Sequence, residues 1–162
     1  WLGAPNFYIE QAVGPTELKG YRDTQNILLV LFKGLAAKDR LVQLAKSQGQ
    51  LARLRTTVLV VADAEISMPD DLPFTVIHQG SAPIWASYEL LMRTVANRGS
   101  PDRLGMEWQH AEFLIDRFGF VRARWIAGAD SNGWESMNEL YPQIEKLNVE
   151  PRLKPPPDDH VH

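Results

Sequence analysis

The four histidines are the side chains best suited to chemistry in this chain, because it contains no cysteine. Thiol–disulfide exchange requires a thiolate nucleophile, so thiol chemistry is excluded from the start. Imidazole then remains as the common ligand for copper, zinc or nickel. His78 and His110 lie in the body of the sequence, and His160 and His162 lie at its end. Metal binding is therefore the first chemistry to consider.

His110 has the richer set of potential ligands around it. Met106 lies four residues earlier and offers a thioether, which Cu(I) accepts, and Glu107 and Glu112 offer harder oxygen ligands. A simpler interpretation is that His110 and His78 are hydrogen-bonded histidines at strand ends, and that Met106 is a packing residue. A metal site at His110 and Met106 is thus a hypothesis that stands beside a purely structural one.

The last residues, 151–162, predict an extended proline-rich tail. Pro155-Pro156-Pro157 forms a stiff spacer before the sequence ends in His160-Val161-His162. In an extended segment, residues i and i+2 project to the same side, so both imidazoles would lie close to the terminal carboxylate. Such a cluster suits Cu(II) or Zn(II), although disordered tails often carry these residues without function.

Composition indicates one soluble globular domain, which we place at residues 1–150, followed by the tail. The chain has 162 residues, of which 44% are hydrophobic and 23% charged. A net charge of −3 without a basic cluster argues against nucleic acid as a partner. No apolar run reaches the roughly 18 to 20 residues needed to span a bilayer. Because the chain begins with Trp1, we expect a processed product or an excised domain of a larger protein.

The elements that must position these residues alternate between strand and helix. Apolar and β-branched runs predict strands, apolar stripes at helical spacing predict helices, and Gly119 marks the turn of a hairpin. We predict strands over 27–32, 57–62 and 74–78, helices over 36–54, 81–93 and 131–147, and a hairpin of strands 111–115 and 120–126.

This alternation predicts a layered α/β domain with parallel strand pairing. The carboxyl ends of parallel strands share one edge of the sheet, and an antiparallel strand begins there. Ala37, His78 and His110 should therefore all lie along that edge, where open α/β sheets bind their ligands.

Three segments in order resemble the thioredoxin-like superfamily, in particular its peroxiredoxins and thiol–disulfide reductases. The segment Phe32-Lys33-Gly34 with Gln43-Leu44 is similar to the active-site segment that normally carries two cysteines. Leu18-Lys19-Gly20-Tyr21-Arg22 is similar to the element before the first core strand, and Phe113 to Trp125 is similar to the closing hairpin.

The resemblance implies a fold class, namely an α/β thioredoxin-like three-layer fold with a central mixed β-sheet, an antiparallel C-terminal hairpin and flanking helices. It also implies that Ala37 and Arg40 stand at the two vestigial thiol positions. Neither side chain can replace a thiolate, so we predict a protein that is not an enzyme of the thiol–disulfide or peroxidase kind.

A narrower resemblance concerns His-x-Glu before the hairpin, the missing cysteines and the tail Asp-Asp-His-Val-His. These features are similar to the soluble C-terminal domain of bacterial membrane proteins of the copper resistance protein D type. That likeness implies a redox-inactive accessory domain in the periplasm, a membrane-embedded copper transporter as its partner, and copper as the one candidate cofactor. The candidate ligands are His110, Met106, His160 and His162.

The alternative is a non-catalytic protein–protein docking module that uses the former active-site edge. Trp85, Trp108 and Trp134 are either ordinary core residues or parts of an apolar patch for such a partner. Hydrolysis by Ser81 with His78 has little support, since the chain has no Gly-x-Ser-x-Gly segment and no positioned acid.

Overall fold

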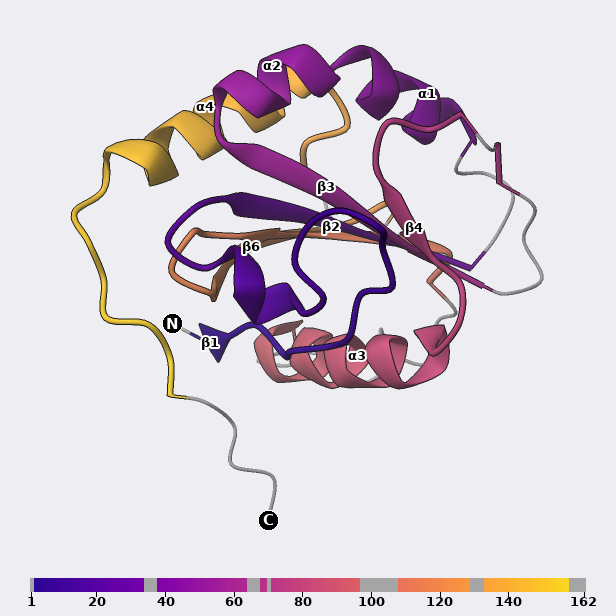
Figure 1. Cartoon of the computed structure of the whole chain (residues 1–162), viewed down its shortest axis with the longest axis horizontal. Coiled ribbons are helices and arrows are strands. Elements are labelled where there is room, and N and C mark those ends of the chain that lie inside the picture. Colours follow the sequence, from indigo (N-terminus) through magenta and orange to yellow (C-terminus); the bar gives the residue numbers. More distant parts are fainter. Residues whose placement is uncertain are drawn as a thin grey trace.

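A computed structural model describes residues 2–33, 38–63, 68–69, 71–96, 108–128 and 133–157. Within these ranges one six-stranded sheet lies between two layers of helices, as Figure 1 shows. The strand order is β1-β6-β5-β2-β3-β4, in which β2 pairs in parallel with β3, β3 pairs in parallel with β4, and all other neighbours are antiparallel. The strands are β1 (Leu2–Gly3), β2 (Asn26–Phe32), β3 (Thr56–Ala62), β4 (Thr75–Ile77), β5 (His110–Ile115) and β6 (Phe120–Ile126).

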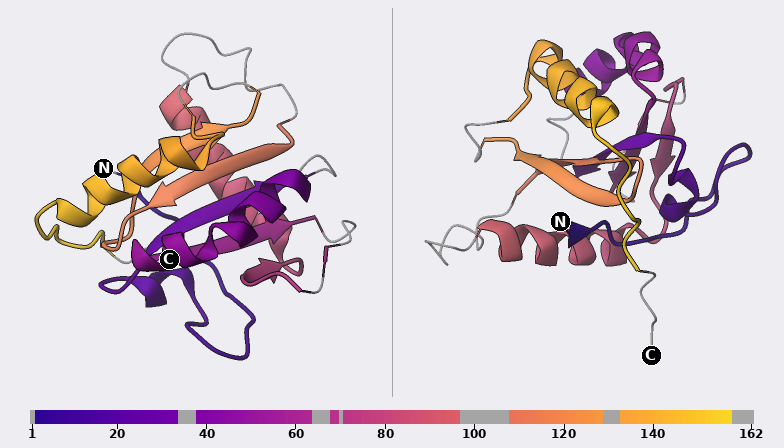
Figure 2. Two further views of the ribbon diagram at one scale, coloured as in Figure 1. Left: turned by 90° about the horizontal axis from the view of Figure 1, so that it is seen from above. Right: turned by 90° about the vertical axis from the view of Figure 1, so that its left-hand side faces the viewer.

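Both faces of the central strand β2 are buried, which explains its uninterrupted apolar run. Leu29 and Leu31 point into the core under α3 (Ser81–Ala96). Leu28 and Val30 point into the opposite core, under the other helices. Figure 2 shows α3 on one side of the sheet, with α1, α2 and α4 together on the other side. The predicted three-layer thioredoxin-like architecture is confirmed.

The predicted helix over 36–54 is in fact two helices, α1 (Lys38–Lys46) and α2 (Gln48–Arg53). Ser47 separates them, and its hydroxyl donates to the carbonyl of Gln43 at 2.8 Å. This back-bonding competes with regular helix geometry, and Gly49 lowers helix propensity directly afterwards. The single-helix prediction was therefore wrong at this break.

The closing hairpin is confirmed, with Gly119 at φ +97° in its turn. The last helix, α4 (Met137–Val149), begins six residues later than predicted. Ser136 caps it by accepting a hydrogen bond from the backbone of Asn138, which sets its start. The preceding Trp134 is buried in the core instead of being helical, so tertiary packing displaced the predicted boundary.

The N-terminal segment forms a hairpin-like approach, with Tyr8 bridged to Glu17, before a short 3-10 helix, η1 (Leu18–Tyr21). The tail after α4 is extended as far as Pro157, and Pro156 packs against Gly3 of β1. None of the helices in the described ranges is both long and apolar enough to cross a lipid bilayer.

Candidate functional site

A buried ion pair between Arg40 and Glu112 occupies the carboxyl-end edge of the sheet. Helix α1 turns Arg40 toward the sheet beside Leu41 and Leu44, and β5 places Glu112 beneath it. The guanidinium donates from Nε to Oε2 at 2.8 Å and from Nη2 to Oε1 at 2.7 Å. The side chains are 6% and 0% exposed. This is the bidentate geometry in which an arginine–carboxylate pair is strongest.

Two further donors complete the hydrogen bonding of Glu112. His110 donates from Nε2 to Oε2 at 2.6 Å, and the indole of Trp134 donates to Oε1 at 2.8 Å. Burial by itself would raise the pKa of Glu112, but the hydrogen bonds from His110 and Arg40, together with the charge of Arg40, hold that pKa below its ordinary value. Glu112 is therefore a carboxylate whose two oxygens are both fully engaged.

The remaining guanidinium nitrogen of Arg40 is also paired. Its Nη1 donates to the side-chain oxygen of Gln43 at 2.8 Å and to the backbone carbonyl of Glu135 at 3.2 Å. The guanidinium carbon lies 5.1 Å from the ring centroid of Trp125, a cation–π contact. We call Arg40, Glu112, His110 and Trp134 the buried ionic cluster, and it joins α1, β5 and the approach to α4.

The chemical consequence concerns the two positions that resemble a thiol pair. Ala37 lies outside the described residues. At the other position, Arg40 is a permanently charged group that an ion pair holds in place, and it has no nucleophilic atom. The chain cannot perform thiol–disulfide exchange, because it holds no cysteine anywhere. In its place the buried ionic cluster ties three elements together.

His110 is the one member of the cluster that retains an unused polar atom. Its ring lies between Phe32, at a centroid distance of 4.8 Å, and Trp125, at 5.2 Å, and its side chain is 14% exposed. Because Nε2 donates to a carboxylate, the neutral ring carries its lone pair on Nδ1. Within the described ranges Nδ1 makes no hydrogen bond. This nitrogen is the available ligand or base of the site.

The structure places His78 at the same edge as His110, as predicted, but does not bring the two together. His78 follows β4 and His110 begins β5, with β3 and β2 between them. Three strand spacings amount to about 14 Å, which is too far for a shared metal ion. His78 Nδ1 lies 3.4 Å from the backbone oxygen of Asp63 instead.

Most of the other predicted ligands are not described by the structure. Met106, Glu107, His160 and His162 lie outside the described residues. Glu112, considered as an oxygen ligand, has no lone pair to spare and belongs to the buried ionic cluster. Among the described residues no group of three or more histidine, aspartate or glutamate side chains could hold a metal ion.

A second cluster lies on the α3 side of the same edge, and the sequence indicated its Trp85 and Trp108 but not Lys33 or Glu89. The ammonium of Lys33 pairs with Glu89 at 2.7 Å and lies 4.4 Å from the ring centroid of Trp108 and 5.6 Å from that of Trp85. Trp108 also donates its indole N–H to Glu89 at 3.0 Å. We call these four residues the tryptophan–lysine cluster; all four are partly exposed. Trp134, in contrast, is a core residue.

Signals for the ionic cluster were present in the sequence. Glu112 stands in an otherwise apolar strand that is buried on both faces, and a buried carboxylate requires a cationic partner. Arg40 directly precedes Leu41 on the stripe of α1 that faces the core. Lys33 and Glu89 of the tryptophan–lysine cluster had no comparable signal, because the members of this cluster come from three distant parts of the chain.

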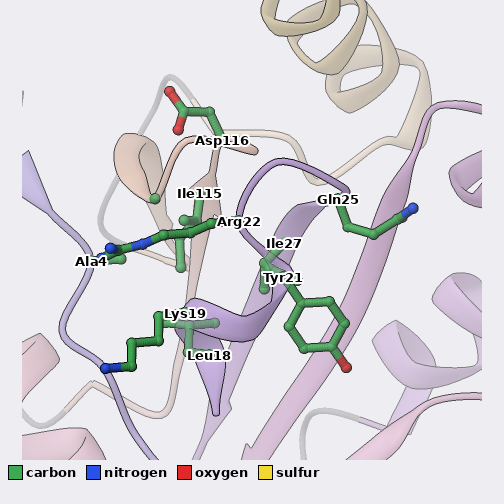
Figure 3. Close-up of a pocket in the computed structure, with 10 residues that line it drawn as sticks. Ala4, Leu18, Lys19, Tyr21, Arg22, Gln25, Ile27, Ile115 and Asp116 are labelled. Atoms are coloured by element: carbon green, nitrogen blue, oxygen red, sulfur yellow. The ribbon is translucent and has the colours of Figure 1, made fainter. Parts of the chain in front are cut away.

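A small hollow at the opposite end of β2 and β5 is not a ligand site. Figure 3 shows Tyr21, Ile27 and Ile115 among its lining residues, with Arg22 extended beside them. Its volume of about 10 Å³ is roughly the room that one water molecule needs.

Comparisons with known proteins support the fold and nothing beyond it. No family model matches the chain, and no curated protein matches its sequence. Among solved structures, a Plasmodium yoelii thioredoxin peroxidase I is similar over 90% of this chain and 88% of its own, with a TM-score of 0.62 and 16% identity. A Chlorobium tepidum protein assigned as thiol:disulfide interchange protein DsbE is similar over 90% and 94%, with a TM-score of 0.56 and 18% identity. The mitochondrial 2-Cys peroxiredoxin of Plasmodium falciparum is similar over 90% and 92%, with a TM-score of 0.60 and 16% identity.

The chain is therefore a domain of thioredoxin-like fold that contains no cysteine. At these identities the likeness concerns the fold alone, and the chemistry of this chain must be argued from its own residues.

Proposed function

We propose that this chain is a redox-inactive, thioredoxin-like accessory domain of a bacterial copper-handling system. The observation that carries the non-catalytic part is the ion pair of Arg40 with Glu112, which fills a vestigial thiol position with a structural contact. The copper part rests on the narrower sequence resemblance, together with the orientation of His110. We place the domain in the periplasm, beside a membrane-embedded copper transporter.

His110 is the proposed anchor for copper. Proteins commonly orient a metal-binding imidazole by hydrogen-bonding its second ring nitrogen to a carboxylate, and Glu112 holds Nε2 of His110 in this way. That arrangement presents Nδ1 to a metal. One imidazole does not make a specific site, so further donors must come from outside the described residues, with Met106 as the first candidate. The tail residues His160 and His162 are the second candidate.

Copper titration of the full chain tests this part. The key variant is His110→Gln, because glutamine keeps an amide donor for Glu112 and lacks the imidazole nitrogen. We expect one bound copper to be lost in His110→Gln and retained in His78→Ala, the control at the same edge. A double variant His160→Ala/His162→Ala separates the tail from the edge. Unchanged stoichiometry in His110→Gln would remove His110 from the proposal.

The tryptophan–lysine cluster favours the second candidate, a docking module. Tryptophans that are partly exposed beside a charged pair have the composition of binding hot spots. Docking predicts that Trp108→Ala weakens binding to the transporter's membrane domain in lipid nanodiscs, with or without copper, while His110→Gln does not. The opposite pattern, binding that requires copper and His110, would rule out docking through this cluster.

A further inference from the structure

The tryptophan–lysine cluster has no part in the proposed copper site. Trp85 and Glu89 lie on α3, Lys33 directly follows β2, and Trp108 precedes β5. The ammonium nitrogen of Lys33 lies 2.7 Å from Oε1 of Glu89. The centroids of the indole rings of Trp108 and Trp85 lie 4.4 Å and 5.6 Å from the same nitrogen. One compact cation is therefore held by a carboxylate and two aromatic rings.

The groups that hold this cation are positioned without its help. Trp108 donates its indole N–H to Oε1 of Glu89 at 3.0 Å, a hydrogen bond in which Lys33 takes no part. Trp85 and Glu89 are four residues apart on α3, so the helix fixes their spacing. Both tryptophans also pack against the core under α3. Without the ammonium of Lys33, a preformed site of negative charge and aromatic surface would remain.

Lys33 is held weakly enough to be exchanged. Its side chain is 30% exposed and that of Glu89 is 31% exposed, so water reaches both. An ion pair at this exposure contributes little to stability. The backbone of Lys33 is fixed, because its N–H donates to the carbonyl of Gln109 at 2.8 Å, whereas its four-carbon stem is flexible. The ammonium can therefore leave without disrupting the end of β2.

Glu89 has a carboxylate oxygen that is not in use. Lys33 and Trp108 both contact Oε1, and within the described ranges Oε2 makes no hydrogen bond or ion pair. An incoming cation can pair with Oε2 before Lys33 leaves. Replacement of one ammonium by another also keeps the charge of the cluster unchanged, so no carboxylate is left without a counter-ion.

We propose that the tryptophan–lysine cluster binds the lysine side chain of a partner protein in exchange for Lys33. Lys33 identifies the class of ligand, because a primary ammonium on a four-carbon stem already fits the site. Cations are attracted to the faces of aromatic rings, and most strongly to those of tryptophan. The proposal deepens the docking candidate and rests on it for the partner. Its test uses neither partner nor membrane, so the two can fail separately.

The test is an NMR titration of the full chain with n-butylammonium chloride, which reproduces the lysine side chain beyond Cα. Sodium chloride keeps the ionic strength constant, and n-butanol is the uncharged control ligand. We expect saturable shifts of the indole N–H signals of Trp85 and Trp108 and of the side-chain carbon signals of Lys33. The indole of Trp134, which lies in the opposite core, should not respond.

Variants separate the roles of the two charged residues. Lys33→Ala removes a tethered competitor with a high effective concentration, so butylammonium should bind about tenfold or more tightly than to the unchanged chain. Adding Glu89→Gln to Lys33→Ala removes the carboxylate charge and should weaken binding by roughly threefold. Lys46→Ala, which removes an exposed lysine of α1 on the other side of the sheet, should leave affinity unchanged.

Three results would overturn the proposal. The first is the absence of saturable shifts in Lys33→Ala, and the second is equal shifts with n-butanol, since the site would then be only an apolar surface. The third is a set of Lys33 signals that stay fixed in the unchanged chain at concentrations far above those that saturate Lys33→Ala. Lys33 would then be a permanent structural contact. Binding of butylammonium together with undisturbed docking of Trp108→Ala supports the site and refutes only the transporter as its partner.

Discussion

The buried ion pair between Arg40 and Glu112 makes the sharpest stability prediction. Glu112→Gln removes the negative charge, keeps the side-chain volume, and leaves Arg40, 6% exposed, as a buried cation without its counter-ion. Removing one partner of a buried ion pair lowers the free energy of unfolding by about 3–5 kcal/mol. Because glutamine still offers one oxygen to the donors around it, we expect a loss near 3 kcal/mol. That is a large part of the stability of a typical domain.

Removing both partners should cost less than the two single changes together. Arg40→Met keeps a long apolar side chain, and in Arg40→Met/Glu112→Gln neither charge remains to be buried unpaired. We expect a coupling free energy of about 2 kcal/mol or more. Urea unfolding of the full chain, followed by tryptophan fluorescence and extrapolated to water, measures each free energy of unfolding.

The matched control is Glu145→Gln, the same substitution at an exposed position of α4, which should change the free energy of unfolding by no more than about 0.5 kcal/mol. If the two single changes add without coupling, or if each costs under about 1 kcal/mol, the ion pair does not hold α1 on β5. A structural role for Arg40 at the proposed vestigial thiol position would then be refuted.

Three further predictions test other contacts. The full chain should show no peroxide or disulfide turnover above the buffer background, and measurable turnover would contradict the thiol argument. The pKa of Glu150 is lowered by its hydrogen bond from Arg122, and the pKa of Glu112 is lowered as well. Both carboxylates therefore contribute stability that is present above about pH 4.3 and is lost as the pH falls through their folded-state pKa values. The urea midpoint, measured from pH 6 to pH 3, should therefore decrease below about pH 4.3, and this decrease should be smaller in Glu150→Gln. A midpoint of the unchanged protein that does not vary with pH would refute this prediction. Gly119→Ala should cost about 1–3 kcal/mol, because φ is +97° and the new Cβ would lie 2.6 Å from Nε of Arg22. Gly49→Ala, in a helix with open space around it, should be neutral or stabilising, and equal effects on the urea midpoint in the two variants would exclude the backbone explanation.

The local sequence pattern was sufficient to predict those strands and turns that depend only on nearby residues. The apolar run of β2 and the glycine turn between β5 and β6 were predicted within a residue or two, since periodicity and turn chemistry act over short distances. Boundaries failed where distant packing intervened. Trp134 is drawn into the core by Glu112, 22 residues earlier, and α4 can begin only after it.

In the candidate site, too, the sequence predicted the local features and missed the contact between distant residues. The edge position of His110 followed from strand order and the rule that parallel strands end together. Its hydrogen bond to Glu112 also lies within reach of sequence reasoning, because residues two apart in a strand share a face. The ion pair of Glu112 with Arg40 could not be predicted from the sequence, because the two residues lie 72 positions apart along the chain.

The sequence by itself determined that this protein has no thiol chemistry and that its strands alternate with helices in thioredoxin-like order, because composition and short-range pattern suffice for both. Only the tertiary structure decided what Arg40 contacts. Whether Arg40 is a solvated surface charge or one half of a buried pair depends on which strand lies beneath α1.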